Sequence, residues 1–205
     1  MRLQPFAGHQ GARRGLIAAL ALAALAAAGC QQHSEETGPP ASSASTPQTS
    51  ETSCKSGAPE KTARAFYTAI IPDNDSGLPS AASMPALGPL MTSALRAAVE
   101  KARARQGAFI AAHPNEKPPY IEGSLFTSMF EGPTAVESAD ATRNGDSATV
   151  GMGFAYVEEG AETFRWKDQA LMRCEEGSWR LDDVRYGGDW DFASKGQLKQ
   201  ALESE

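Results

Sequence analysis

An uncharged apolar segment near the N-terminus constrains this chain more than any other feature. Residues 15–29 contain only Gly, Ala, Leu and Ile, and the charged residues before them are Arg2, Arg13 and Arg14. A basic region, an apolar core and small residues before a cleavage point are typical of an export signal. The apolar run is shorter than the roughly 20 residues that a membrane-spanning helix needs. We therefore expect residues 1–29 to be removed and to take no part in the fold.

The residues that end this segment indicate the kind of signal. Ala27-Ala28-Gly29-Cys30 resembles the lipobox of bacterial lipoproteins, whose signal is cut before a lipidated cysteine. The resemblance implies that Cys30 carries palmitate-type acyl chains, each contributing about 0.8 kcal/mol per buried methylene to a permanent anchor. Gln31, where Asp would imply inner-membrane retention, implies the outer membrane, facing the periplasm. A plain secretory signal is the alternative, because Ala27 stands where lipoproteins usually have Leu.

The rest of the chain divides into a tether and one domain. Residues 31–57 contain no large apolar side chain and cannot bury enough surface to offset the entropy of ordering. We expect residues 1–29 to be a lipoprotein signal peptide, 30–57 the lipidated cysteine and a disordered tether, and 58–205 a single domain. About 150 residues suit one hydrophobic core.

The charge of the mature chain restricts its partners. All three charges before Cys30 are arginines, so 16 of the 19 Lys and Arg remain against 25 Asp and Glu, a net charge of −9. This balance argues against binding nucleic acid or an anionic bilayer surface, both of which need cationic side chains. It is compatible with a basic protein partner.

Two stretches have the apolar spacing of amphipathic helices. The first, Pro59–Ile71, has Pro in its first turn and Pro72 after its end. The second has a basic tail, Lys101–Arg105, and we expect it to end before Gly107. The two apolar stripes are Ala63, Phe66, Tyr67, Ile70 and Ile71, and Leu87, Leu90, Met91, Leu95, Ala98 and Val99.

From about Thr134 the apolar period changes to two, which is typical of strands. Asn144-Gly145 signals a tight hairpin turn. Strands are expected over residues 148–156, 164–174 and 179–186, in an antiparallel meander with one face covered by helices. A short helix over Gln197–Glu203 ends the domain.

This arrangement carries a second resemblance. Two N-terminal helices, a curved antiparallel sheet and Trp179–Val184 near its end resemble the cone-shaped nuclear transport factor 2-like (cystatin-like) fold. Phe66-Tyr67, Leu125–Phe130 and Trp179–Val184 are also similar to a family of bacterial lipoproteins that carry a domain of unknown function. The resemblance implies an α+β fold with two N-terminal helices packed on a curved meander, and it implies no activity, because the cone fold hosts enzymes and binders alike.

The domain offers little catalytic chemistry. Its only histidine, His113, lies in a stretch that reads as a loop, and there is no serine elbow, phosphate-binding glycine loop or Cys-x-x-Cys motif. Asp73–Gly77 begins like a calcium loop, but Met84 stands where the bidentate Glu would be, so we interpret it as a turn. We expect no catalytic residue, no cofactor and no metal site.

Asp168 is the most unusual polar residue, because strand alternation places it on the apolar face beside Trp166. A carboxylate there must be hydrogen-bonded, paired with a cation or raised in its pKa. One interpretation is a structural Asp bonded to backbone amides or exposed at the rim of the sheet. The other is a ligand pocket on the concave face, lined by Asp168, Trp166 and Tyr67.

Two further carboxylate clusters lie near the C-terminus. Adjacent strand residues point to opposite faces, so we do not expect Asp182 and Asp183 to act together in catalysis. We expect them to pair with Arg180 or Arg185 or to bond within a turn. The second cluster interleaves acids with aromatics and follows two glycines; its residues are Asp189, Trp190, Asp191 and Phe192. Such aromatics either anchor a protein partner or cap the open end of the cone.

Cysteine usage predicts one disulfide. Once Cys30 is lipidated, Cys54 and Cys174 are the only thiols left, and an oxidising envelope favours bridging an even pair. The alternative is that Cys174 is a buried small hydrophobe.

These features favour a non-catalytic protein-binding module held at the cell envelope. Its sharpest version is an immunity-type inhibitor of an antibacterial toxin, with a basic secreted toxin as partner. A small-molecule binder or cryptic enzyme that uses the pocket around Asp168 is one alternative, and a structural accessory of the envelope is another.

Overall fold

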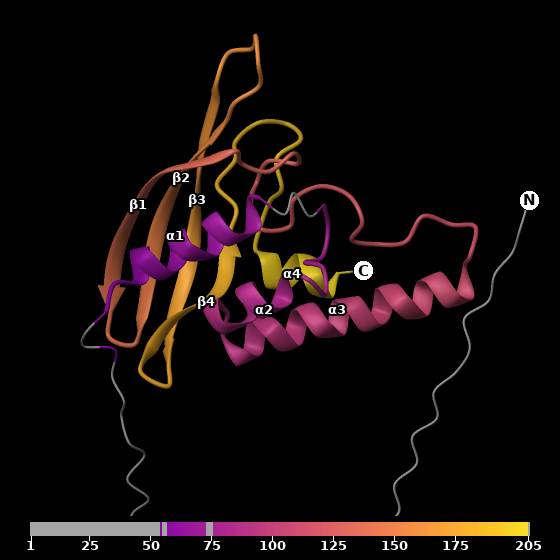
Figure 1. The fold of residues 1–205 in the computed structure, drawn as a ribbon, viewed down its shortest axis with the longest axis horizontal. Helices are drawn as coiled ribbons and strands as arrows, with labels where there is room; N and C mark the ends of the chain where they lie inside the picture. The colour runs from indigo at the N-terminus through magenta and orange to yellow at the C-terminus, as the bar shows by residue number, and fades with distance from the viewer. Residues whose placement is uncertain (1–53, 55–56, 73–75, 205) are drawn as a thin grey trace, which may run out of the picture. The chain divides into compact units, whose positions relative to one another are not determined.

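The fold is α+β, as the sequence predicts. A computed structural model describes residues 54, 57–72 and 76–204 (Figure 1). It contains one open sheet of four antiparallel strands in the order β1-β2-β3-β4, together with helices. No helix in this described part is long and apolar enough to cross a membrane. The predicted signal peptide, Cys30, most of the predicted tether and residues 73–75 of the predicted turn Asp73–Gly77 lie outside the described residues.

The sheet is a simple meander. Its strands are β1 (Ala135–Asn144), β2 (Ser147–Tyr156), β3 (Phe164–Glu175) and β4 (Ser178–Arg185). Asn144 pairs with Ser147, so Gly145 and Asp146 form a two-residue turn, and Gly145 has a φ of 59°, which a glycine adopts without a Cβ clash. The alternation seen in the sequence places one set of side chains in the core: Ala148, Val150, Met152, Phe154, Trp166, Ala170 and Met172.

Helix α1 (Pro59–Ile70) covers the apolar face of the sheet. It contacts all four strands, and Figure 1 shows it lying across them. Ala63, Phe66 and Tyr67 are fully buried, as the apolar stripe predicts. The predicted first helix is confirmed to within one residue at its C-terminus.

The predicted second helix is wrong at both ends. Residues 84–90 form α2 (Met84–Leu87) and the 3-10 helix η1 (Gly88–Leu90), and the chain is then extended at Thr92. The Thr92 hydroxyl accepts a hydrogen bond from the amide of Leu95 at 3.1 Å, and α3 (Ser93–Ala112) begins there. The helix continues through Gly107 because a helical glycine costs only about 1 kcal/mol relative to alanine. It ends at His113, because the following proline disfavours helix at the residue before it.

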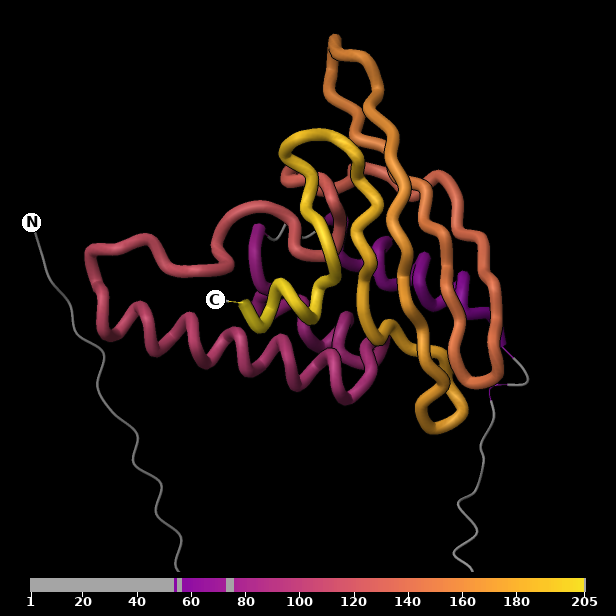
Figure 2. The backbone as a smooth tube through the Cα atoms, turned by 180° about the vertical axis from the view of Figure 1, so that it is seen from behind, coloured from indigo at the N-terminus to yellow at the C-terminus, as the bar shows by residue number. Residues whose placement is uncertain are grey.

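The remaining helix packs at the β4 side of the sheet. Helix α4 (Leu198–Glu203) matches the predicted segment, contacts α3 and β4, and buries Leu198 and Leu202. Figure 2 shows α3 and α4 side by side beyond the last strand.

The expected arginine partners of the acidic pair in β4 are wrong. The pairing register of β3 and β4 shifts at Asp182, which forms a bulge. Asp182 Oδ1 accepts from the Thr92 hydroxyl at 2.9 Å and pairs with Lys199 Nζ at 2.8 Å. Asp183 Oδ1 accepts from the amide of Lys199 at 3.0 Å. The two carboxylates therefore hold the starts of α3 and α4 against the sheet.

Candidate functional site

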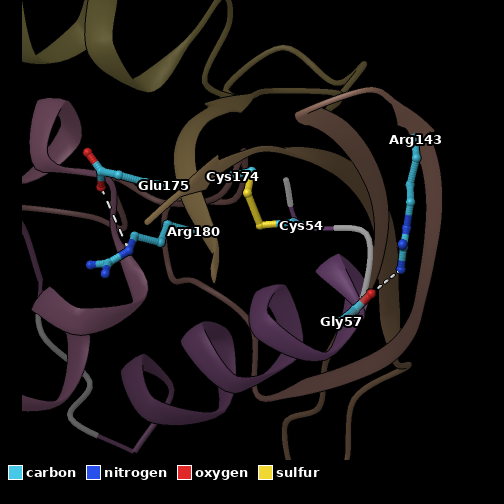
Figure 3. The surroundings of a disulfide bond; sticks show 6 residues. All are labelled: Cys54, Gly57, Arg143, Cys174, Glu175 and Arg180. Atoms are coloured by element: carbon cyan, nitrogen blue, oxygen red, sulfur yellow. Dashed lines mark hydrogen bonds and ion pairs between the residues drawn. A yellow bond between two sulfur atoms is a disulfide. The ribbon is translucent and has the colours of Figure 1, made fainter. Parts of the chain in front are cut away.

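A disulfide bond joins one end of the sheet to the chain just before α1. Cys54 and Cys174 form the predicted disulfide, with sulfurs 2.02 Å apart and Cα atoms 5.7 Å apart (Figure 3). Arg143 donates to the carbonyl of Gly57, and its guanidinium lies 5.6 Å from the ring centre of Trp179. We call this group the disulfide end. It fixes the chain just before α1 begins.

Near the other end, Asp168 is the centre of a buried polar network. Its side chain is 1% exposed. Oδ2 accepts from the amide of Ser128 at 2.8 Å and from the indole of Trp166 at 3.1 Å. Oδ1 accepts from the Ser128 hydroxyl and from the amide of Gly187 at 2.8 Å. These four donors satisfy the carboxylate, which meets the requirement for a buried charge.

Ser128 extends this network to the segment after β4. The amide of Gly188 donates to its hydroxyl at 2.9 Å, and the amide of Ser194 donates to its carbonyl at 2.9 Å. We call Asp168, Ser128 and the amides of Gly187 and Gly188 the polar anchor. It closes the base of the loop 187–196 from both sides.

Two buried tyrosines hold the segment that contains Ser128. Tyr67 donates to the carbonyl of Phe126 at 2.9 Å, and Tyr186 donates to the carbonyl of Leu125 at 2.6 Å. Burial is the main cause that raises the pKa of both phenols, and the charge of Asp168 adds to it. Both tyrosines therefore stay neutral donors and position the segment that carries Ser128.

The two glycines are required by close packing. A Cβ on Gly187 would lie 2.2 Å from the carbonyl oxygen of Lys167. A Cβ on Gly188 would lie 2.6 Å from that of Ala193. The Lys195 ammonium also donates to the carbonyl of Gly188 at 2.6 Å. The loop is thus compact at its base and has little freedom there.

This loop carries a tight turn with aromatic side chains. The amide of Ala193 donates to the carbonyl of Trp190 at 3.2 Å, which defines what we call the aromatic turn, Trp190–Ala193. Trp190 meets Phe164 edge to face, with ring centroids 5.0 Å apart, and lies 6.4 Å from Trp166. Phe192 is 91% exposed. Of the two predicted aromatics, Trp190 packs on the sheet and Phe192 projects into solvent.

Exposed carboxylates lie in the two segments that carry or lead into these aromatics. Asp189 and Asp191 flank Trp190, and the connection between β2 and β3, which leads into Phe164, carries Glu158, Glu159 and Glu162. All five side chains are exposed. Within the described residues, none of them forms a salt bridge. These carboxylates therefore give the two segments an acidic exposed surface.

The residues expected to line a pocket lie in the core. Asp168, Trp166 and Tyr67 are buried and bond to other parts of the chain. Two hollows among the described residues lie elsewhere: one of about 370 Å³ includes Ile70 and Tyr156, and another of about 540 Å³ includes Phe109. Asp168, Trp166 and Tyr67 line neither of these hollows. A ligand site around Asp168 stays a prediction.

Other candidates for chemistry are dispersed. His113 ends α3, where its ring stacks on Phe109 and its Nδ1 lies 3.1 Å from Glu116 Oε1. Among the residues that the structure describes, no three His, Cys, Asp or Glu side chains are placed to hold a metal ion.

Comparisons with known proteins found no relative. No family model matches this chain, and neither a curated protein nor a solved structure does. The site is therefore interpreted from its own geometry.

Sequence reasoning found Asp168 but missed Ser128. The alternation of apolar and polar residues in β3 identifies Asp168 as a carboxylate on an apolar face. Ser128 lies 40 positions before Asp168, in a segment that has no such periodicity. The Gly187-Gly188 pair was the available signal, since consecutive glycines indicate a close backbone approach.

Proposed function

We propose that this protein is a bacterial lipoprotein, anchored through Cys30 in the outer membrane facing the periplasm, whose domain binds a protein partner without catalysis. One observation carries the binding role: the polar anchor holds a loop from which Phe192 projects, 91% exposed. An aromatic side chain on a preorganised loop loses little conformational entropy on binding, which favours a protein-binding anchor.

The loop holds Phe192 in a fixed position. An exposed phenylalanine on a mobile segment has no fixed geometry, and its exposure alone carries little information. Here the loop is bonded at both ends to Ser128, which is itself held by the buried Asp168. Trp190, the first residue of the turn, packs against Phe164 of β3 and so attaches the turn to the sheet. The domain thus maintains an apolar side chain in water at a defined position.

We propose an immunity-type role as the specific form of this function. In that role, a lipoprotein resident in the envelope occludes an antibacterial toxin delivered to the periplasm. The export signal, the lipobox and the acidic surface support it. We also propose that the open sheet with α1 across it is a small member of the nuclear transport factor 2-like cone class, in the family of lipoproteins with a domain of unknown function that the sequence resembles.

A competition experiment tests this function. The gene is deleted in the bacterium that carries it, and the deletion strain is grown in contact with its parent. We expect the parent to kill the deletion strain and the wild-type gene to restore survival. Cys30→Ala and Phe192→Ala should each fail to restore it, while Asp146→Asn, at the other end of the sheet, should restore it fully. Equal survival of the deletion strain would contradict the immunity role.

A localisation experiment tests the anchor separately. Cys30→Ala should move the protein from the membrane fraction to the soluble periplasmic fraction, with the electrophoretic mobility of an unlipidated chain. Unchanged membrane retention of the variant would contradict lipidation at Cys30.

A further inference from the structure

We infer that the aromatic turn and its acidic surroundings form a docking surface for a cationic protein segment, one that presents arginine or lysine. This inference rests on the proposed binding role and names the chemistry of the partner. The surface consists of Phe164, Trp190 and Phe192 with Glu158, Glu159, Glu162, Asp189 and Asp191. Figures 1 and 2 both show the β2–β3 connection and the loop after β4 at the same end of the sheet.

The aromatic rings of the surface can bind cations. Phe164 is 41% exposed and Phe192 is 91% exposed, so both rings are accessible to solvent. A guanidinium or ammonium over such a face gains cation–π energy and buries its apolar stem on the ring. The carboxylates beside the rings supply ionic hydrogen-bond acceptors for the same group.

Charge excludes the other occupants of this surface. A second copy of the chain would bring Asp189 and Asp191 against identical carboxylates, which repel. Anionic headgroups and nucleic-acid phosphates are repelled for the same reason. The only ammonium in the loop, that of Lys195, is held at its base by the carbonyl of Gly188. A cationic protein segment is the occupant that complements both the rings and the charges.

The surface lies at the end of the sheet opposite the disulfide. Strands β2 and β3 run from the disulfide end to the aromatic turn, and ten residues of extended chain in β2 span about 30 Å. The chain enters the domain at Cys54, at the far end of β3 from Phe164. Cys54 and the aromatic turn therefore lie at opposite ends of β3.

Binding of defined peptides to the full-length lipoprotein in detergent tests this inference. The probes are a short labelled peptide of alternating Arg and Gly and its Glu-Gly counterpart, followed by fluorescence anisotropy at low salt. We expect the Arg peptide to bind and the Glu peptide not to bind. Phe192→Ala and the double variant Asp189→Asn/Asp191→Asn should each raise the Kd at least about fivefold.

The matched control is Asp140→Asn/Asp146→Asn, which removes the same charge from β1 and its turn. It should raise the Kd less than about twofold, as expected for distant exposed charges. No binding of the Arg peptide, equal binding of the Glu peptide, or equal weakening by the two double variants would each overturn the inference. If the last result came with a normal immunity phenotype, the proposed function would survive and only the cationic docking surface would fail.

Discussion

The two ends of the sheet are held in different ways. At the disulfide end, a covalent bond between Cys54 and Cys174 fixes the segment before α1. At the opposite end, the loop 187–196 is held by hydrogen bonds to Asp168 and Ser128. The first device acts mainly by restricting the unfolded chain. The second acts only in the folded state, where it satisfies a buried charge and positions the aromatic turn.

Removing the disulfide and removing the polar anchor should therefore have different effects. Removing the disulfide should lower the stability of the whole domain while the native aromatic turn keeps its geometry. Removing the polar anchor should cost less stability and release the loop. Loss of global stability and release of the loop can therefore be measured separately.

The largest effect is expected for the double variant Cys54→Ser/Cys174→Ser. The bridge closes a loop with a sequence separation of 120, which the chain-entropy model equates with about 4–5 kcal/mol. Urea denaturation should show this loss in the free energy of unfolding, and the reduced wild-type protein should match the variant. A loss below about 1 kcal/mol would show that the bridge does not restrict the unfolded chain in this way.

The Asp168→Asn variant should lower the free energy of unfolding by about 2–4 kcal/mol. The asparagine side chain replaces one carboxylate oxygen by an NH2 group, which cannot accept a hydrogen bond. Buried donors such as the amides of Ser128 and Gly187 then lose an acceptor. Asp140→Asn on the exposed part of β1 is the control and should change stability by less than about 0.5 kcal/mol. Equal effects of the two variants in thermal denaturation would show that the anchor contributes nothing.

Gly187→Ala should cost about 1–3 kcal/mol, because the new methyl group meets a backbone carbonyl that cannot move independently. Gly107→Ala is the matched control. No atom lies within 4 Å of a Cβ at that position in α3, so the substitution should instead stabilise the domain by about 1 kcal/mol. Opposite signs in the two melting temperatures are the expected result, and the same sign would refute the packing argument.

The smallest effect concerns Glu175, which holds the start of α3 from the disulfide end. Its carboxylate accepts from the hydroxyl and the amide of Ser93, and these bonds lower the pKa of Glu175 below its usual value. Glu175→Gln should therefore cost about 0.5–1 kcal/mol at neutral pH. Because the pKa is lowered in the folded state, this contribution is present above the usual glutamate pKa and lost as the pH falls through the lowered value. A difference between wild type and Glu175→Gln that does not shrink in acid would contradict this assignment.

The sequence could predict the disulfide end because it depends on composition. Cys54 and Cys174 are the only cysteines besides the proposed lipidation site, and an oxidising envelope would favour pairing them. Strands β2 to β4, α1 and α4 were predictable for a similar reason, since burial on one face leaves a period in the sequence. The first strand, β1, was not among the expected strands, and its side chains are mostly exposed. The error at α3 came from Gly107, whose helix-breaking tendency is too small to end a helix with favourable neighbours.

The other end was less predictable, because its contacts join segments that share no period. Asp168 could be found by alternation, but Ser128, Gly187 and Gly188 reach it from two irregular segments. The spacing around Trp190 and Phe192 could not distinguish the ring that packs on the sheet from the ring that projects. That choice depends on the turn closed by Ala193, which is set by the three-dimensional position of the loop base.

Hydrogen exchange at the amides of Gly187 and Gly188 tests most directly whether the polar anchor holds the aromatic turn. In the wild-type protein, both amides donate to buried acceptors and should exchange slowly. In Asp168→Asn, their exchange should accelerate at least about tenfold, while the amides of central β2 remain protected. Fast exchange at both glycines in the wild type, or no change in the variant, would contradict the account.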